Sequence, residues 1–547
     1  MSLKVPRPPG QQLFKDGYRS SQGVEDAVQR NIAAVHELTE ILRTSFGPNG
    51  RNKIIINHLS KVILTADAAT IMRELEVIHP AAKLLVMASQ QQEAEMGDAT
   101  NLVIILAGEL LAQAGQLLTI GLHPSEVIQG FEVAGKFCQE TIEQLAVDDI
   151  GDLRDEKQLA KAVRTAIGAK QYGNEELLGE LVSEAILAIL PKNPANFNVD
   201  SIRVVKVLGS SLQQSRVIKG MVFPREAEGV VKKASKAKVA VFTCPLDISQ
   251  TETKGTVLLH NAKEMLDFTK GEENQLEAIV KELYDAGIRV VVTGSALGDL
   301  MLHYLNRYGI FVIKVLSKFD LRRLCRVIGA TPLARVGAPM PEETGTVDVV
   351  ETIEIGGDRV TVFRQENEQT KTATIVIRGA TQNHLDDIER AIDDGVNVVK
   401  ALVKDSRLVP GAGATEMELL KRIEALGDRT PGLLQHGIKK YAQAFEIIPR
   451  TLAENAGLDV SEVLARLHAA HYKHEHGLIG LDVEESETGM VDAKKAGVLD
   501  VLAAKAWAIK LATEAALTVL SVDQIIMSKV AGGPKVPQQS AGWDNDE

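Results

Sequence analysis

The amino-acid sequence predicts a multi-domain protein that combines a helical domain with an α/β domain. At 547 residues the chain is too long for one ordinary hydrophobic core, and this length suggests about three domains. Apolar residues recur at helical spacing in the first and last thirds. In the middle, short β-branched runs alternate with helical segments. These observations predict a helical part built from both ends and an α/β part between them.

The first third is predicted to form four long helices. An apolar stripe at spacings of three and four predicts a helix that begins near Val24 and ends before Gly47 and Pro48. Pro80 and Pro124 are suited to the first position of a helix, and an apolar stretch follows each of them. A further helix is expected over residues 102–118. Near the other end, residues 499–527 are apolar and alanine-rich, which predicts one buried helix packed against these N-terminal helices.

The middle of the chain alternates strand and helix patterns, which is typical of βαβ units. The segment 249–273 is polar and amphipathic without a strand pattern, and we expect it to form an exposed helical arm. Because termini often lie together and insertions are tolerated at the surface, the simplest arrangement inserts the α/β part into the helical part. Strands are expected at 237–242, 288–293, 310–315, 360–364 and 374–378, with a helix over 275–286.

Composition excludes several function classes. The chain carries 61 basic and 73 acidic side chains, a net charge of −12, so general nucleic-acid binding is not expected. The three cysteines, Cys138, Cys244 and Cys325, are far apart, which predicts neither a disulfide framework nor a cysteine-based zinc site. The first residues lack the apolar core of a signal peptide, and no uninterrupted apolar stretch is long enough to cross a bilayer, so a cytoplasmic protein without membrane partners is expected.

Four segments combine small residues with groups that suit phosphate or a cation. The motif GPNG at 47–50 is also ordinary turn chemistry, and Asp67 in TADAAT is also a plausible helix N-cap. The motif GDATN at 97–101 opens a helix, whose free N–H groups suit phosphate, while Asp98 suits Mg²⁺. The fourth segment, PGAGATE at 410–416, enters a helix. No P-loop or Rossmann signature is present.

Two weaker candidates have simple alternatives. His471, His474 and His476 offer metal ligands, but their spacing does not give one helical face, and a solvated helix end is the favoured interpretation. Asp393 and Asp394 follow Glu389 and Arg390, a pattern typical of a solvated charged face of a helix.

Taken together, in their order and separation, these segments resemble those of the group II chaperonins over nearly the whole chain. The matching segments are GPNG at 47–50, ADAAT at 66–70, HPAAK at 79–83, GDATN at 97–101, TAIGAK at 165–170, VPGAGATE at 409–416 and VLDV at 498–501.

The resemblance implies the chaperonin fold, with a helical equatorial domain, a small α/β intermediate domain and an inserted α/β apical domain that carries a helical protrusion. It places the equatorial domain at 1–147 and 405–547, the intermediate domain at 148–217 and 371–404, the apical domain at 218–370 and the protrusion at about 249–273.

The resemblance also implies residue roles in binding ATP and Mg²⁺. Asp98 is expected to bind Mg²⁺, and Asp500 to accept the ribose hydroxyls. Asp394 and Asp67 are expected to flank the γ-phosphate, with Asp394 activating the attacking water. The remaining nucleotide contacts are expected from Phe46, Gly47, Pro48, Ala99, Thr100, Asn101, Gly168, Ala169, Lys170, Gly411, Ala412 and Gly413.

Departures from the family pattern bear on these roles. Ala68, Ala99 and Ala412 stand where the family has glycine, and each alanine is unfavourable if its backbone needs a positive φ. Asn101 replaces a threonine and Ala169 a serine. All the carboxylates remain, so ATP hydrolysis is still expected, although it is expected to be slow.

The function that the resemblance implies is that of one subunit of a hetero-oligomeric double ring that folds unfolded polypeptides, actin and tubulin among them, driven by ATP. Two alternatives stay open at this point. One is a structural ring subunit that binds nucleotide but hydrolyses little, and the other is a small-molecule kinase or similar nucleotide-dependent enzyme.

Overall fold

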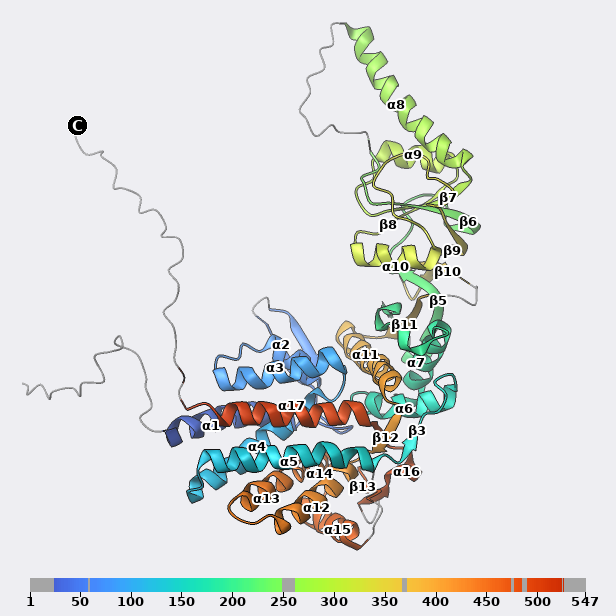
Figure 1. Cartoon of the computed structure of the whole chain (residues 1–547). Helices are drawn as coiled ribbons and strands as arrows, with labels where there is room; N and C mark the ends of the chain where they lie inside the picture. Colours follow the sequence, from blue (N-terminus) through green and yellow to red (C-terminus); the bar gives the residue numbers. More distant parts are fainter. Residues whose placement is uncertain are drawn as a thin grey trace, which may run out of the picture.

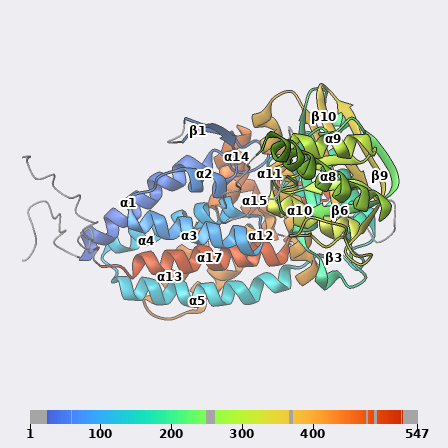
Figure 2. The ribbon, with the colours of Figure 1, turned by 90° about the horizontal axis from the view of Figure 1, so that it is seen from above.

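The computed structural model describes residues 24–57, 60–247, 261–365, 371–473, 477–484, 489–523 and 525. The molecule is elongated (Figure 1). A bundle of long helices forms one end, a large sheet with flanking helices extends away from it, and helix α8 forms the far tip. Segments from the two ends of the chain meet in the bundle, since α17 packs against the N-terminal helices α3, α4 and α5 (Figures 1 and 2).

The helical bundle has one large hydrophobic core, to which both ends of the chain contribute. The pattern predicted for the first third is confirmed, and Pro80 and Pro124 each occupy a helix N-terminus. The helices are α1 (Val24–Arg43), α2 (Ala68–Glu74), α3 (Pro80–Glu95), α4 (Thr100–Ile120), α5 (Pro124–Ile142), α12 (Ala414–Arg429), α13 (Leu434–Ala444), α14 (Ile447–Ala456), α15 (Val460–Lys473), α16 (Ala493–Ala496) and α17 (Leu502–Leu520).

Helix α4 corrects one expectation. Among the described residues it is the one helix that is long and apolar enough, by length and composition, to cross a membrane. In the fold it contacts α1, α3, α13 and α17, and nearly every side chain from Leu102 to Leu111 is buried. The apolar character of this helix is accounted for by its central place in the bundle core.

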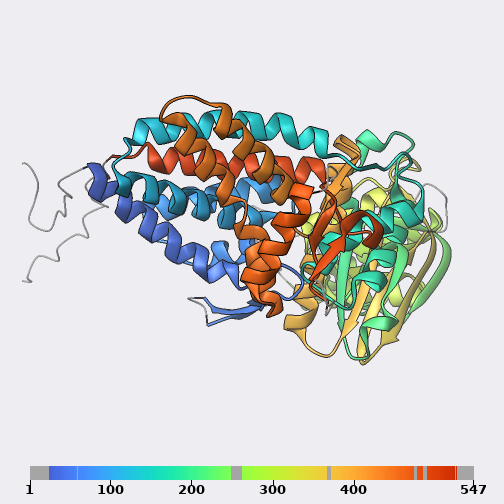
Figure 3. The same cartoon turned by 90° about the horizontal axis from the view of Figure 1, so that it is seen from below.

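The last predicted helix begins later and ends earlier than expected. Residues Leu499–Val501 form strand β15, which pairs antiparallel with β12 (Arg407–Pro410), and α17 follows directly. Strand β12 also pairs with β3 (Asp148–Asp149). Two hairpins complete the bundle: β1 (Lys53–Ile56) with β2 (Val62–Thr65), and β13 (Ile479–Leu481) with β14 (Met490–Asp492). The first hairpin projects from the bundle (Figure 3).

The middle of the chain forms an eight-stranded mixed sheet in the order β4-β11-β5-β10-β9-β6-β7-β8. All five predicted strands are present, with ends shifted by a few residues. The parallel pairs β6–β7, β7–β8 and β4–β11 agree with the predicted alternation, while the other pairs are antiparallel. The strands are β4 (Ile202–Leu208), β5 (Arg216–Phe223), β6 (Lys233–Phe242), β7 (Ile288–Thr293), β8 (Phe311–Lys314), β9 (Gly345–Ile355), β10 (Asp358–Arg364) and β11 (Ala373–Gly379).

Strand β5 changes partner within its length. Residues Arg216–Lys219 pair with β11, and Gly220–Phe223 pair with β10. Gly220 marks the change with a φ of 130°, and a Cβ there would lie 2.0 Å from the carbonyl oxygen of Phe363. Only glycine fits this close backbone approach. The sheet is therefore continuous across two separate hydrophobic cores, one beside α6, α7 and α11 and one beside α10.

The flanking helices are α6 (Glu156–Gly168), α7 (Glu175–Ile189), α8 (Ala262–Asp285), α9 (Asp299–Arg307), α10 (Lys318–Ile328) and α11 (Gln382–Lys404). Short 3₁₀ turns lie at Glu143–Leu145, Pro194–Asn196, Val199–Ser201 and Leu212–Gln214. Helix α8 contains both the second half of the expected arm and the helix predicted over 275–286, and residues 249–260 lie outside the described residues.

Candidate functional site

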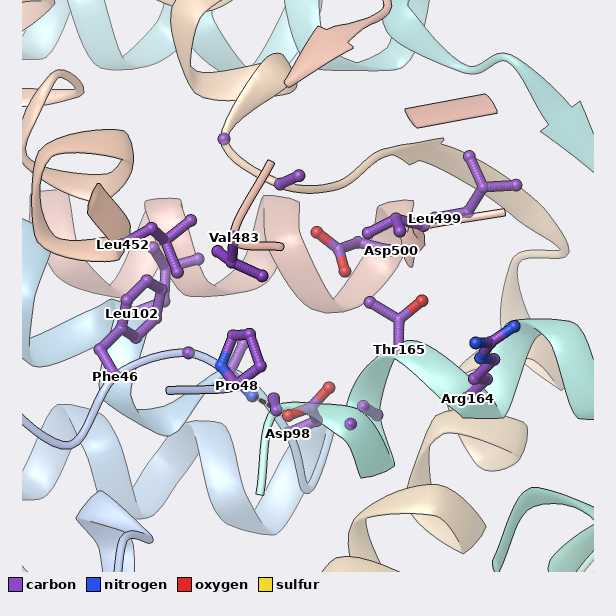
Figure 4. A pocket seen from close by; sticks show the side chains of 18 of the residues that line it. Phe46, Pro48, Asp98, Leu102, Arg164, Thr165, Leu452, Val483, Leu499 and Asp500 are labelled. Atoms are coloured by element: carbon purple, nitrogen blue, oxygen red, sulfur yellow. Dashed lines mark hydrogen bonds between the residues drawn. The ribbon is translucent and has the colours of Figure 1, made fainter. Parts of the chain in front are cut away.

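A cavity of about 480 Å³ lies where the helical bundle meets α6 and α11. In Figure 4, Asp98 and Asp500 come from opposite walls, Thr165 of α6 lies to one side, and Phe46 and Leu452 lie at the other end. The cavity brings together segments from both ends of the chain. The predicted residues that line it are Phe46, Gly47, Pro48, Asp98, Ala99, Thr100, Asn101, Gly168, Ala169, Lys170, Ala412, Gly413 and Asp500.

Three predicted residues lie outside this lining. Gly411 packs behind it, where its N–H donates to the carbonyl of Val498 at 2.9 Å. Asp67 and Asp394 line a neighbouring polar cavity of about 550 Å³. They are nevertheless joined to the first cavity, because both carboxylates form ion pairs with Lys170, which lines it. Asp67 and Asp394 thus meet at Lys170, which itself lines the first cavity.

The loop that carries Asp67 is built by local hydrogen bonds. Asp67 caps α2, as one interpretation of the sequence predicted, and its Oδ2 accepts from the Thr70 N–H at 2.9 Å and from the Thr70 hydroxyl at 2.7 Å. Its Oδ1 accepts from the Thr100 hydroxyl at 3.2 Å. The capping and functional interpretations of Asp67 are therefore compatible, since capping orients the carboxylate.

Buried amides hold the cavity loops together. Gln92 on α3 donates from Nε2 to the carbonyls of Asp98 at 2.8 Å and Ala504 at 3.1 Å. Asn101 accepts from the Ala68 N–H at 2.8 Å and donates to the carbonyl of Ala66 at 3.2 Å. The Asn101 side chain, expected to contact phosphate, is thus engaged with neighbouring loops. Sequence reasoning missed Gln92, whose only signal is a polar residue on a buried helix face.

Two of the three alanines that replace family glycines have left-handed backbones. Ala99 has a φ of 62° and Ala412 a φ of 53°. An L-residue in this region costs about 1–2 kcal/mol relative to its ordinary conformation. Ala68, in contrast, is the first residue of α2, where alanine is favourable. The condition stated for these alanines, a positive φ, is therefore met at Ala99 and Ala412 and is not met at Ala68.

Lys170 lies between two buried carboxylates. Its Nζ is 3.1 Å from Asp67 Oδ1 and forms a second ion pair with Asp394 Oδ2. Burial alone would raise the pKa of Asp67, but the charge of Lys170 and the hydrogen bonds from Thr70 hold that pKa below its usual range. Burial raises the pKa of Asp394 well above its usual range, and the negative charges of Asp98 and Asp67 add to the effect. The charge of Lys170 and its hydrogen bond to Asp394 oppose this rise and favour the ionised carboxylate, the form that is able to accept a proton.

Asp98 has the character of a cation ligand. Burial raises the pKa of this carboxyl group, which accepts a 2.6 Å hydrogen bond from the Ala99 N–H. A divalent cation would compensate the buried charge, and Mg²⁺ typically takes one or two carboxylates together with phosphate oxygens. No cluster of three or more metal-ligating side chains occurs among the described residues, so one protein carboxylate beside a phosphate is the arrangement that fits.

The wall opposite Asp98 contains a second buried lysine. Lys505 of α17 pairs with Asp500 of β15 at 2.7 Å and with Glu416 of α12 at 3.0 Å. Across the mouth of the cavity, the Tyr172 hydroxyl donates to Glu484 Oε1 at 2.7 Å. The sequence analysis predicts no role for Lys505, Glu416, Tyr172 or Glu484, because in the sequence each looks like an ordinary charged or polar residue.

Two simple interpretations from the sequence also need correction. Asp394 does not lie on a solvated helix face, since it is 8% exposed and forms an ion pair with Lys170. His471 is buried, and its ring nitrogens lie 2.7 Å from the carbonyl of Ile479 and 3.5 Å from Glu418, so it is not on a solvated helix end. His474 and His476 lie outside the described residues.

This fold and site define a class of protein. Residues 38–530 match the model of the TCP-1/cpn60 chaperonin family, and the chain belongs to that family. The chain is therefore a chaperonin, as the motif order predicted, and the alternative of a small-molecule kinase is set aside.

Similar proteins narrow the class. The chain is 63% identical to a protein of Schizosaccharomyces pombe named probable T-complex protein 1 subunit theta, 57% identical to the theta subunit of Saccharomyces cerevisiae and 51% identical to that of Homo sapiens. Each match covers all of both chains. The alanine after Asp67 and the segments GPNGRNKIIINHL, KQYGNEE and AGGPK predict this theta type, of the eukaryotic cytosolic chaperonin TRiC/CCT, and the prediction is confirmed.

Proposed function

We propose that this chain is an ATP-hydrolysing subunit of a hetero-oligomeric double-ring chaperonin in the cytoplasm. The observation that carries the proposal is the convergence of Asp67 and Asp394 on Lys170, at the wall of a cavity that Asp98 and Asp500 line. A buried cluster of this kind is costly unless a ligand or partner uses it, which makes it a candidate for chemistry.

The first cavity is suited to ATP. The Gly97–Asn101 turn and the N-terminus of α4 offer N–H groups to the phosphates, and Asp500 offers an acceptor to the ribose hydroxyls. Asp98 would hold Mg²⁺, which neutralises phosphate charge when bound. Asp394, held as a carboxylate by its ion pair with Lys170, would accept the proton of the attacking water, and Lys170 would orient both Asp394 and Asp67.

The site joins residues of the bundle to residues of α6 and α11. Asp98 lies just before α4 of the bundle, Lys170 follows α6 and Asp394 lies on α11. Asp500 lies in β15, whose Leu499 and Val501 pack in the same hydrophobic cluster as α6 and α11. We propose that the bundle is the equatorial domain (1–147 and 405–547), that α6, α7 and α11 belong to the intermediate domain (148–217 and 371–404), and that 218–370 forms the apical domain. Closure of the site would then move the apical domain and α8.

The partners proposed are the other subunits of the ring and unfolded polypeptide clients, with actin and tubulin implied by the family. Nucleic acid and membrane are not among them. A second candidate function, a ring subunit that binds nucleotide but hydrolyses little, is favoured by the left-handed Ala99 and Ala412, since backbone strain in these loops makes the exact geometry that hydrolysis requires costly to hold.

Substitution Asp394→Ala tests the proposal in assembled particles. ATP binding, measured by photolabelling of this chain with 8-azido-ATP, should be retained, while the turnover due to this chain should fall by about 10²–10⁴-fold. Asp393→Ala on the same helix is the matched control and should keep turnover. Full turnover in the Asp394→Ala particle would remove Asp394 from the mechanism, and turnover that is negligible before substitution would favour the second candidate.

A further inference from the structure

The cavity wall contains an ion triad of Glu416, Lys505 and Asp500, of which the proposed function uses Asp500 alone. Lys505 Nζ lies 2.7 Å from Asp500 Oδ2 and 3.0 Å from Glu416 Oε1. The Lys505 and Glu416 side chains are 8% and 2% exposed, whereas the Asp500 side chain is 30% exposed. The triad thus runs from a buried carboxylate, through the lysine, to a carboxylate that faces the cavity.

Three elements distant in the sequence position this triad. Glu416 lies in the first turn of α12, where a negative charge is favourable at the positive end of the helix dipole. Lys505 lies one turn into α17, and Asp500 lies in β15, just before that helix. Because β15 pairs with β12, which leads into α12, the two carboxylates approach the lysine from opposite sides.

The pairing is asymmetric, and this asymmetry bears on ligand binding. Lys505 engages Oδ2 of Asp500, so the carboxylate is held by one oxygen and presents its remaining acceptor capacity to the cavity. Without the lysine cation, Glu416 and Asp500 would be two carboxylates near each other in a poorly hydrated wall. Repulsion between the two would then turn the more exposed Asp500 away from its place in the cavity wall.

We propose that Lys505 is a positioning residue for sugar recognition, which holds the Asp500 carboxylate in the orientation by which the chain distinguishes a ribonucleotide from a nucleotide without ribose hydroxyls. Glu416 holds the lysine from the far side. The inference rests on the proposed nucleotide site and adds to it a determinant of specificity.

The test measures sugar discrimination on this chain alone. Assembled particles are photolabelled with radioactive 8-azido-ATP, and ATP or 2′,3′-dideoxy-ATP competes for labelling of this chain, which is separated by electrophoresis. Before substitution, ATP should compete about tenfold better or more, because a hydrogen bond to a charged group has that effect. In Lys505→Met particles the two competitors should become nearly equal, as in Asp500→Asn particles, mainly because ATP competes less well.

Two further variants guard against a general loss of structure. Lys505→Met leaves Glu416 buried without a partner, so the double variant Lys505→Met with Glu416→Gln removes that charge too, and it should show the same loss of discrimination. Lys510→Met, on the same helix but with a side chain 45% exposed, is the matched control and should keep discrimination. Sedimentation of the particles checks assembly.

The outcomes separate the two proposals. Discrimination that survives in the double variant, with ATP still bound, would overturn the role of Lys505 and leave the nucleotide site intact. A particle in which this chain is never labelled, with or without substitution, would overturn the nucleotide site itself.

Discussion

The two sides of the cavity are built in different ways. The side that belongs to the bundle consists of loops tied to a continuous hydrophobic core by buried amides such as Gln92 and Asn101. The side that belongs to α6 and α11 contributes charged groups, Lys170 and Asp394. Of their two ion pairs, the one between Lys170 and Asp67 reaches the bundle. Hydrogen-bonded loops of a packed core hold their shape, whereas an ion pair between two elements is able to open. We infer that the first side binds and the second side reacts.

Substitution of Lys170 is expected to have the largest effect on turnover and tests the division between the two sides of the cavity. Lys170→Met would leave Asp67 and Asp394 buried beside Asp98 without their cation, so one carboxyl group would stay protonated. Turnover by this chain should fall by about 10²-fold, with photolabelling by 8-azido-ATP changed much less. Lys161→Met, a half-exposed lysine of α6, is the matched control. An equal loss of binding and turnover would contradict the division between a binding side and a reacting side.

The strained alanines sharpen the comparison on the binding side. Ala99→Gly and Ala412→Gly should each relieve about 1–2 kcal/mol of left-handed strain, partly offset by the greater freedom of glycine in the unfolded chain. Nucleotide affinity and thermal stability of the particle should therefore rise modestly, as measured by photolabelling and by scanning calorimetry.

Ala68→Gly is the control for these two substitutions, because Ala68 begins a helix and has no strain to relieve. It should lower stability slightly. A loss of stability at all three positions would show that the loops do not store strain.

The smallest expected effect concerns the hydrogen bond across the mouth of the cavity. Tyr172→Phe removes the bond to Glu484, which joins the α6–α7 connection to the bundle hairpin. Because this bond is exposed, its loss should speed nucleotide release by only about two- to fivefold, measured by chasing labelled ADP from the particle. Tyr472→Phe, which removes a similar exposed bond to Glu424 on the bundle, should leave the release rate unchanged. An unchanged rate in Tyr172→Phe would mean that the two sides open without this contact.

The class of fold and most of the loops that line the first cavity could be predicted from local sequence patterns. Helical periodicity indicated α1, α3, α4 and α5, and β-branched runs indicated the strands, because these patterns reflect local burial and are readable without neighbours. The loops at Gly47, Asp98 and Gly413 were identified since small residues and a carboxylate must lie close together there along the chain.

The pairing of charges that lie far apart in the sequence could not be predicted from local patterns. Asp394 was assigned a solvated face by its local pattern, and Lys505 and Glu416 were assigned no role, because the partner of each lies tens to hundreds of residues away or on another element. Strand β15 was taken for helix because its alanine-rich surroundings favour helix, whereas pairing with β12 overrides that preference. Propensity acts within a few residues, but burial of charge and pairing of strands depend on the whole fold.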